Sequence, residues 1–163
     1  MAIVLSSCQT NSLQSFMVDH KGDENFISLD FSLKTFVDNF DNLTPEQQAV
    51  FEDVRKVNFL AFKKDQTNAE AYDEKRNILM DILNDEFKDN QLMSVNTDGN
   101  QMKMYADNLD EKVKEIVVYA GNADKGFLVM RLLGDNLNPS NFYKLMQMSE
   151  EMNFDALAKM VDL

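Results

Sequence analysis

Residues 115–146 read EIVVYAGNADKGFLVMRLLGDNLNPSNFYKLM, and this stretch decides the fold. Two apolar runs, at 116–120 and 127–133, flank a short polar segment that has a glycine at each end. Near-continuous apolar runs are typical of strands covered on both faces, and glycine with short polar residues is typical of a turn. The stretch therefore predicts two adjacent strands at the centre of the core. Asn138 and Pro139 fit the cap and first turn of a helix that folds back on them.

Arg131 is the one charged residue in the second apolar run. On a pleated strand it shares a face with Phe127 and Val129. Its guanidinium can pair with a cross-strand acid such as Glu115 while its aliphatic stem packs, or it can bind a ligand. Both interpretations stay open, and the usual pairing of buried charges favours the ion pair.

Asp135, Asn136 and Asn138 lie where the second strand ends and the next helix begins. Backbone N–H groups at such a junction can meet an anion. These three residues and Arg131 are therefore the candidate site for a ligand or a partner. A small-ligand binder or a carboxylate-based enzyme with its site near residues 134–138 follows as an alternative function. A turn followed by a helix cap explains the same three residues without a ligand.

The rest of the chain predicts an α+β domain with a mostly antiparallel sheet of about six strands and helices packed mainly on one face. Branched and aromatic residues predict strands at 26–31 and 57–62. A hairpin is expected at 92–105, where Asp98 and Gly99 between alternating runs are typical of a tight turn.

Helix-start signals complete the predicted order of elements. Thr44 and Gln47 form a capping box that opens one helix, and Thr67 with Glu70 predicts a second, which runs to about Asp85. The inward residues expected in this second helix are Ala71, Tyr72, Ile78, Leu79, Ile82 and Leu83. Shorter helical segments are expected at 33–40 and near 107–111, and a last helix after Met152 is one of two interpretations of that segment.

The composition sets limits on function. A chain of 163 residues with 44% hydrophobic residues predicts one folded domain. Its formal charge of −12 opposes nucleic-acid binding, which needs a cationic surface. The single cysteine rules out an internal disulfide, and the single histidine, His20, leaves too few ligands for a zinc site. We expect no metal, no cofactor and no catalytic residues.

The N-terminal residues MAIVLSSC end in the only cysteine of the chain. The motif LSSC at 5–8 matches a lipobox, in which small residues precede a cysteine that becomes lipidated. A full signal peptide also has a basic region and a longer apolar region, and both are missing here. We interpret residues 1–24 as a truncated lipoprotein signal and a polar tether, with Cys8 as the lipidation site. A chance match in a free N-terminal tail is the alternative.

Residues 25–152 then form a single α+β domain, and residues 153–163 form a C-terminal apolar segment. This last segment is either a final helix packed on the domain or an interaction tail.

Four segments together carry a resemblance to a known family: SLQSF at 12–16, FISL at 26–29, KVNFLAF at 56–62 and KGFLVMRLLGDNLNPS at 125–140. They are similar to a family of small Bacteroidota envelope lipoproteins that is known only as a domain of unknown function. The resemblance covers the chain from Cys8 to about Met148. It implies lipid attachment at Cys8 and an outer-membrane location, facing the periplasm of a Gram-negative bacterium. It supplies no catalytic residues.

The leading functional hypothesis is therefore a non-enzymatic envelope lipoprotein that binds a protein or peptide partner. It contacts the membrane through the lipid on Cys8 and does not bind nucleic acid. A self-associating structural subunit, joined through a sheet edge, is a further alternative.

Overall fold

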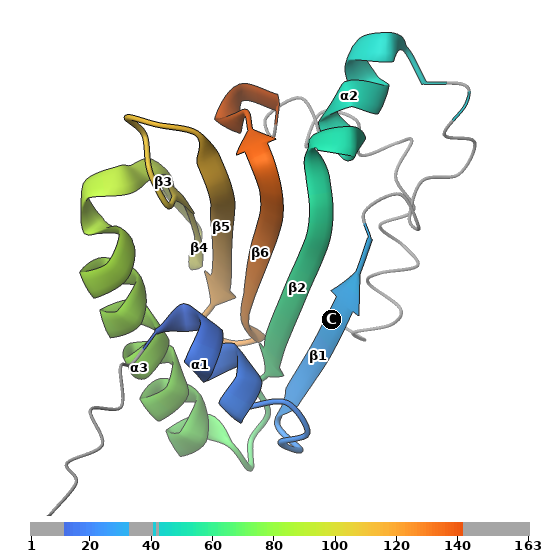
Figure 1. Cartoon of the computed structure of the whole chain (residues 1–163). Helices are drawn as coiled ribbons and strands as arrows, with labels where there is room; N and C mark the ends of the chain where they lie inside the picture. Colours follow the sequence, from blue (N-terminus) through green and yellow to red (C-terminus); the bar gives the residue numbers. More distant parts are fainter. Residues whose placement is uncertain (1–11, 33–40, 42, 142–163) are drawn as a thin grey trace, which may run out of the picture.

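A computed structural model describes residues 12–32, 41 and 43–141, and it contains a six-stranded antiparallel sheet (Figure 1). The strands lie in the order β1-β2-β6-β5-β4-β3, so β5 and β6 are near the centre. The strands are β1 Phe26–Phe31, β2 Val54–Lys63, β3 Gln91–Thr97, β4 Asn100–Ala106, β5 Val113–Asn122 and β6 Gly126–Leu137. The helices are α1 Leu13–Asp19, α2 Pro45–Asp53, α3 Ala69–Phe87 and the short 3-10 helix η3 Lys88–Asn90. The predicted α+β architecture is confirmed.

The predicted central strands are β5 and β6, which form an antiparallel hairpin. Asn122 shapes the turn between them, because its side-chain oxygen accepts hydrogen bonds from the backbone N–H groups of Asp124 and Lys125. Gly126 follows with φ of 134°, and a Cβ there would lie 2.0 Å from the carbonyl oxygen of Phe62 on β2. Only glycine fits this position, because the backbone there has a positive φ and lies in close contact with a neighbouring strand.

The predicted hairpin at 92–105 is also confirmed, as β3 and β4. Asp98 and Gly99 both have positive φ, 46° and 79°, as a primed type I turn requires. β3 forms one edge of the sheet and β1 forms the other.

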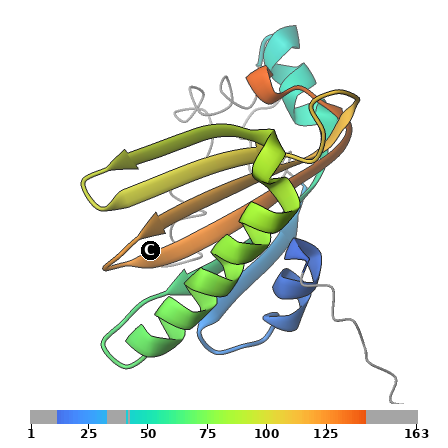
Figure 2. The same cartoon turned by 90° about the vertical axis from the view of Figure 1, so that its left-hand side faces the viewer.

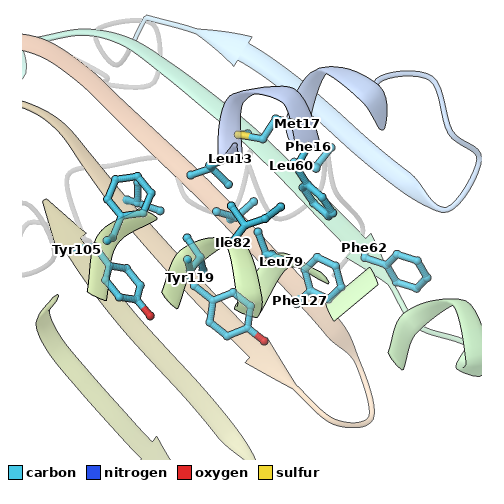
Figure 3. Packing of buried hydrophobic residues seen from close by; sticks show 14 of the residues in the cluster. Leu13, Phe16, Met17, Leu60, Phe62, Leu79, Ile82, Tyr105, Tyr119 and Phe127 are labelled. Carbon is cyan, nitrogen blue, oxygen red and sulfur yellow. The ribbon is translucent and has the colours of Figure 1, made fainter. Parts of the chain in front are cut away.

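One face of the sheet is covered by α1 and α3, and Figure 2 shows α3 running across it with α1 alongside. Leu79, Ile82 and Leu83 of α3 are buried against this face. They pack with aromatic and aliphatic residues of the strands, as Figure 3 shows for Leu60, Phe62 and others. Helices α1 and α3 thus form a layer on this face, in agreement with the prediction that helices pack mainly on one face.

Helix α1 lies in the segment that the sequence assigned to a polar tether, so the folded part of the chain begins earlier than residue 25. Ser12 and Ser15 form a reciprocal capping box at its start. Leu13, Phe16 and Met17 are at most 5% exposed and pack on the sheet. The helix has only 7 residues, so its burial is what stabilises it, and its sequence pattern alone is weak.

The start of α3 differs from the prediction. Asn68 is its N-cap, and no side-chain hydrogen bond caps it. The Thr67 hydroxyl instead donates to Asp65, so the predicted Thr67–Glu70 capping box does not form. Ile78, which was expected inward, is 37% exposed, because it lies at the flank of the buried stripe formed by Leu79, Ile82 and Leu83.

The opposite face of the sheet is apolar as well. Its central residues include Val57, Ile116, Val118 and Leu132, all buried. Helix α2 lies at one end, where Phe51 joins this cluster. The predicted capping box of α2 is present, since Thr44 and Gln47 exchange hydrogen bonds.

Two further predictions concern the ends of the central hairpin. Residues 107–111 form bends rather than a helical turn, because Asp107 is held between strands: its carboxylate accepts from the backbone N–H of Lys114, and its own N–H donates to Glu115. A helical segment begins at Pro139, as predicted. The helices predicted at 33–40 and after Met152, and the rest of the helix predicted to begin at Asn138 and Pro139, lie outside the described residues.

We expect Phe127→Ala to lower the free energy of unfolding by about 3–5 kcal/mol. Phe127 is 3% exposed, and its ring centroid lies 5.5 Å from that of Phe62 and 5.8 Å from that of Tyr72. Urea denaturation measures the change, with Leu109→Ala, at a site that is 47% exposed, as the control. A midpoint that moved no further for Phe127→Ala than for the control would show that this ring is not part of the core.

Candidate functional site

Arg131 is the buried member of the candidate site residues from the sequence whose charge is paired inside the sheet. It is 9% exposed, and its Nε and Nη2 donate to the two carboxylate oxygens of Glu115 at 2.5 and 3.0 Å. A bidentate pair of this kind fixes both side chains and satisfies most of their polar atoms. The ion pair predicted as one of the two interpretations of Arg131 is therefore confirmed.

The Arg131–Glu115 pair continues a polar row on the face that carries α1 and α3. Asp30, Asn58 and Arg131 lie directly opposite one another on β1, β2 and β6. Asn58 donates to Asp30, and Lys21 donates to the other Asp30 oxygen at 2.7 Å. The hydrogen bond from Lys21 lowers the pKa of the Asp30 carboxyl, and that from Asn58 adds to this effect against the opposing influence of burial. These polar residues bond to one another across strands that are already paired in the sheet, so we assign them a structural role.

Asp135, Asn136 and Asn138 do not converge on a cavity with Arg131 in the described part of the chain. Asp135 forms an ion pair with Arg55 at 3.3 Å, and both side chains are largely exposed. Asn136 is exposed within β6. Asn138 caps the following segment, since its side-chain oxygen accepts from the Ser140 N–H at 3.0 Å. The geometry at 134–138 matches a strand end and a helix cap.

His20 is half-buried at the end of α1, where its ring packs against Phe16 and Phe26. Its Nδ1 lies 2.7 Å from the carbonyl oxygen of Phe16, and its ring is 4.6 Å from that of Phe26. Among residues 12–32, 41 and 43–141, no three His, Cys, Asp or Glu side chains are grouped so that they could hold a metal ion. None of the helices described in these ranges has the length and apolar character needed to cross a membrane.

The free edge of β3 is the first feature that could serve binding. Beyond β4, no other strand in the described part of the chain pairs with it, and Figure 2 shows it at the margin of the sheet. Its sequence, QLMSVNT, contains neither a charge nor a proline. Most natural edge strands carry such residues, because they prevent another strand from pairing there.

A groove of about 520 Å³ adjoins this edge. Its apolar floor is one row of opposed residues, Val95, Met102, Ala120 and Leu128, on four successive strands. The row ends at Val95, which lies on the edge strand and is 39% exposed. A strand added to β3 would place a side chain next to Val95 and extend the row by one position.

A smaller, polar cavity of about 290 Å³ lies between α3 and the ends of β4 and β5. Tyr72 and Arg76 of α3, Lys64, and Tyr119 of β5 line it. Burial raises the pKa of Tyr72 and of Tyr119, and the Arg76 charge opposes this rise for Tyr119. The Tyr72 hydroxyl donates a hydrogen bond to the carbonyl oxygen of Asn122 at 3.1 Å.

The sequence did not reveal this cavity. Arg76 is one of several charged residues in the helix predicted to run to about Asp85, and Tyr119 lies within the apolar run at 116–120. The sequence signal that could have indicated a polar site is the tyrosine within an apolar run. A buried tyrosine hydroxyl usually needs a hydrogen-bond partner, whereas a phenylalanine needs none.

We expect Glu115→Leu to lower the free energy of unfolding by about 3–5 kcal/mol, because it leaves the Arg131 guanidinium buried without a counter-charge. Adding Arg131→Met should recover most of that loss. Asp135→Asn, which removes an exposed pair, should cost less than about 1 kcal/mol. Urea denaturation of the four proteins compares these values. A double variant no more stable than Glu115→Leu would contradict this interpretation.

The comparison with known proteins supports one part of the resemblance found in the sequence, which is the likeness to a domain of unknown function. Residues 20–153 match the family model described as Domain of unknown function (DUF4252). Neither a curated protein nor a solved structure shows significant similarity to the chain. The match spans most of the sequence and the whole sheet, and the chain therefore belongs to the DUF4252 family.

Proposed function

We propose that this protein is a non-enzymatic, lipid-anchored protein of the cell envelope that binds an extended segment of a partner protein at the β3 edge. The observation that carries the proposal is the uncharged edge strand beside an apolar groove. We place the protein in the outer membrane of a Gram-negative bacterium, facing the periplasm, on the strength of the lipobox and the family resemblance.

The lipid anchor is supported by the position of Cys8 relative to the fold. Only residues 9–11 separate the cysteine from Ser12, the N-cap of α1. Because α1 is packed on the sheet through Leu13 and Phe16, a lipid on Cys8 would hold the domain within a few residues of the bilayer surface. A short connection of this kind would restrict which side of the domain can meet a partner.

Partner binding at β3 is supported by the chemistry of its edge. An incoming strand would pair its backbone with the free edge, and alternate side chains would reach the groove next to Val95. The rest of the groove rim is polar, with Thr97, Asn100 and Lys125 able to orient a peptide.

The same edge could accept a second copy of the chain. The formal charge of −12 opposes that alternative, because two copies repel each other on approach. A neutral or basic partner experiences no such repulsion, so we favour a different protein as the occupant.

Cys8→Ala should move the protein from the membrane fraction to the soluble fraction when it is expressed from its own gene, because one thiol carries the lipid. Ser7→Ala, which keeps a small residue at the lipobox, is the matched control and should stay with the membranes. Mass spectrometry should find a lipid adduct on Cys8, and globomycin should block processing. A Cys8→Ala protein that still sedimented with membranes would count against the anchor.

A photo-crosslinking amino acid placed at Thr97 should form an adduct with one partner protein in the cells that naturally produce the chain. Val95→Lys in the same protein should abolish the adduct, because a buried, unpaired ammonium would lie at the new strand contact. Val18→Lys is the matched control, since Val18 is also exposed, at 55%, but lies on α1. It should leave the adduct unchanged.

The products separate the alternatives. An adduct between two copies of the chain would favour the self-associating subunit, and light scattering over a range of concentrations would then show a dimer. An adduct that survives Val95→Lys, or none at all, would overturn binding at the β3 edge.

A further inference from the structure

We propose that the polar cavity between α3 and the ends of β4 and β5 binds a small molecule through an oxyanion, either a carboxylate or a phosphate group. The proposal goes beyond partner binding at the β3 edge, and it rests on different residues. It is drawn from a buried hydroxyl whose proton has no acceptor among the described residues, a cation that has no carboxylate partner among them, and the size of the space that they share.

The unpartnered hydroxyl belongs to Tyr119. The residue is fully buried, at 0% exposed, and in the described part of the chain its hydroxyl makes no hydrogen bond of normal geometry. Burial raises the pKa of the hydroxyl, and Arg76 approaches it closely enough to oppose that rise through a hydrogen bond, but a guanidinium only donates, so the phenolic proton still has no acceptor among the described residues. Figure 3 shows the hydroxyl pointing away from the aliphatic residues of the cluster. A buried donor without a partner is costly, so such groups in native proteins usually have a role or a missing partner.

The backbone leaves room for this hydroxyl. A Cβ on Gly121 would lie only 2.3 Å from the Tyr119 oxygen, so any larger residue there would displace the ring. Gln101, whose side-chain oxygen is also buried without a partner among the described residues, lines the same cavity. The two groups meet in one space, but they need different partners: an oxyanion would accept from the phenolic proton, whereas the Gln101 oxygen only accepts and would need a donor group on the same ligand.

The charge of the lining selects an anion. Arg76 and Lys64 line the cavity, and Asp73, an exposed residue, is the acid among the lining side chains. Lys64 is fixed, because its ammonium donates to the Ala123 carbonyl at 2.7 Å and lies 4.4 Å from the centre of the Tyr72 ring. Arg76 has no carboxylate within ion-pair distance in the described part of the chain, although the protein carries 28 acids.

The remaining geometry points to a small ligand. Tyr72 is not available to it, since its hydroxyl already donates to the Asn122 carbonyl at 3.1 Å. Arg76 offers a planar fork of donors that suits carboxylate and phosphate alike. A volume of about 290 Å³ is at the lower end of ligand pockets, so it suits a small metabolite and excludes a long chain.

The test is a titration of the full chain followed by amide NMR shifts, with three probes: acetate, inorganic phosphate and the neutral isostere acetamide. Acetate or phosphate should shift the amides of Tyr72, Gly121 and Asn122 with a dissociation constant of about 1 mM or tighter, and acetamide should not. The tighter of the two anions identifies the class of group that the site recognises. Binding of neither anion, or equal binding of acetamide, would overturn the proposal.

Arg76→Met should weaken anion binding about tenfold, because it removes a charge-assisted pair of hydrogen bonds. Arg55→Met is the matched control on an exposed arginine and should bind as the wild type does. Tyr119→Phe should also weaken binding, yet its urea midpoint should stay the same or rise, because an unsatisfied hydroxyl is removed. A purely structural hydroxyl would lower the midpoint instead.

Unchanged affinity in Arg76→Met would likewise overturn the site. Val95→Lys should leave anion binding intact, so failure of the β3-edge proposal and failure of this one can be told apart.

Discussion

The central hairpin is apolar on both faces, and this constraint shapes the rest of the domain. A strand pair that exposes no polar face must be covered twice, or its hydrophobic surface stays in water. Helices α1 and α3 cover one side of it. On the other side, Phe51 of α2 packs at one end of a second cluster. The edge strands β1 and β3 lie at the margins of the sheet, where a partner can bind without disturbing the core.

Polar groups inside this apolar frame fall into two kinds. Arg131 and Glu115 satisfy each other through a bidentate pair, so the charge within β6 is compatible with burial. The Tyr119 hydroxyl has no such partner in the described residues, although Arg76 lies near enough to influence its pKa. The first arrangement stabilises the sheet, while the second leaves hydrogen-bonding capacity unused. That difference is why the ion pair is assigned to the fold and the cavity to a ligand.

The two proposed binding regions adjoin each other. Gln101, Gly121 and Asn122 line both the apolar groove and the polar cavity, so they lie between the two spaces. A ligand held at Arg76 would contact the same strand ends that support the groove floor. Both proposed binding partners are inferred from the shape, charge and unsatisfied polar groups of these two spaces and not from membership in the DUF4252 family.

The sequence by itself determined the central hairpin, the Asp98–Gly99 turn and the cap at Thr44, because each depends on residues close in sequence or on a strong apolar pattern. It offered the ion pair of Arg131 as one of two interpretations, and the structure selected that one. Only the tertiary structure decided that α1 belongs to the core, because a helix of 7 residues is stabilised by what it packs against. It also decided that Asp107 bridges strand ends and that Tyr119 meets Arg76. The Asp107 contacts depend on how β4 and β5 pair, and the Tyr119–Arg76 contact joins residues that are far apart in the chain. Local patterns carry no information on which partners the sheet register brings together.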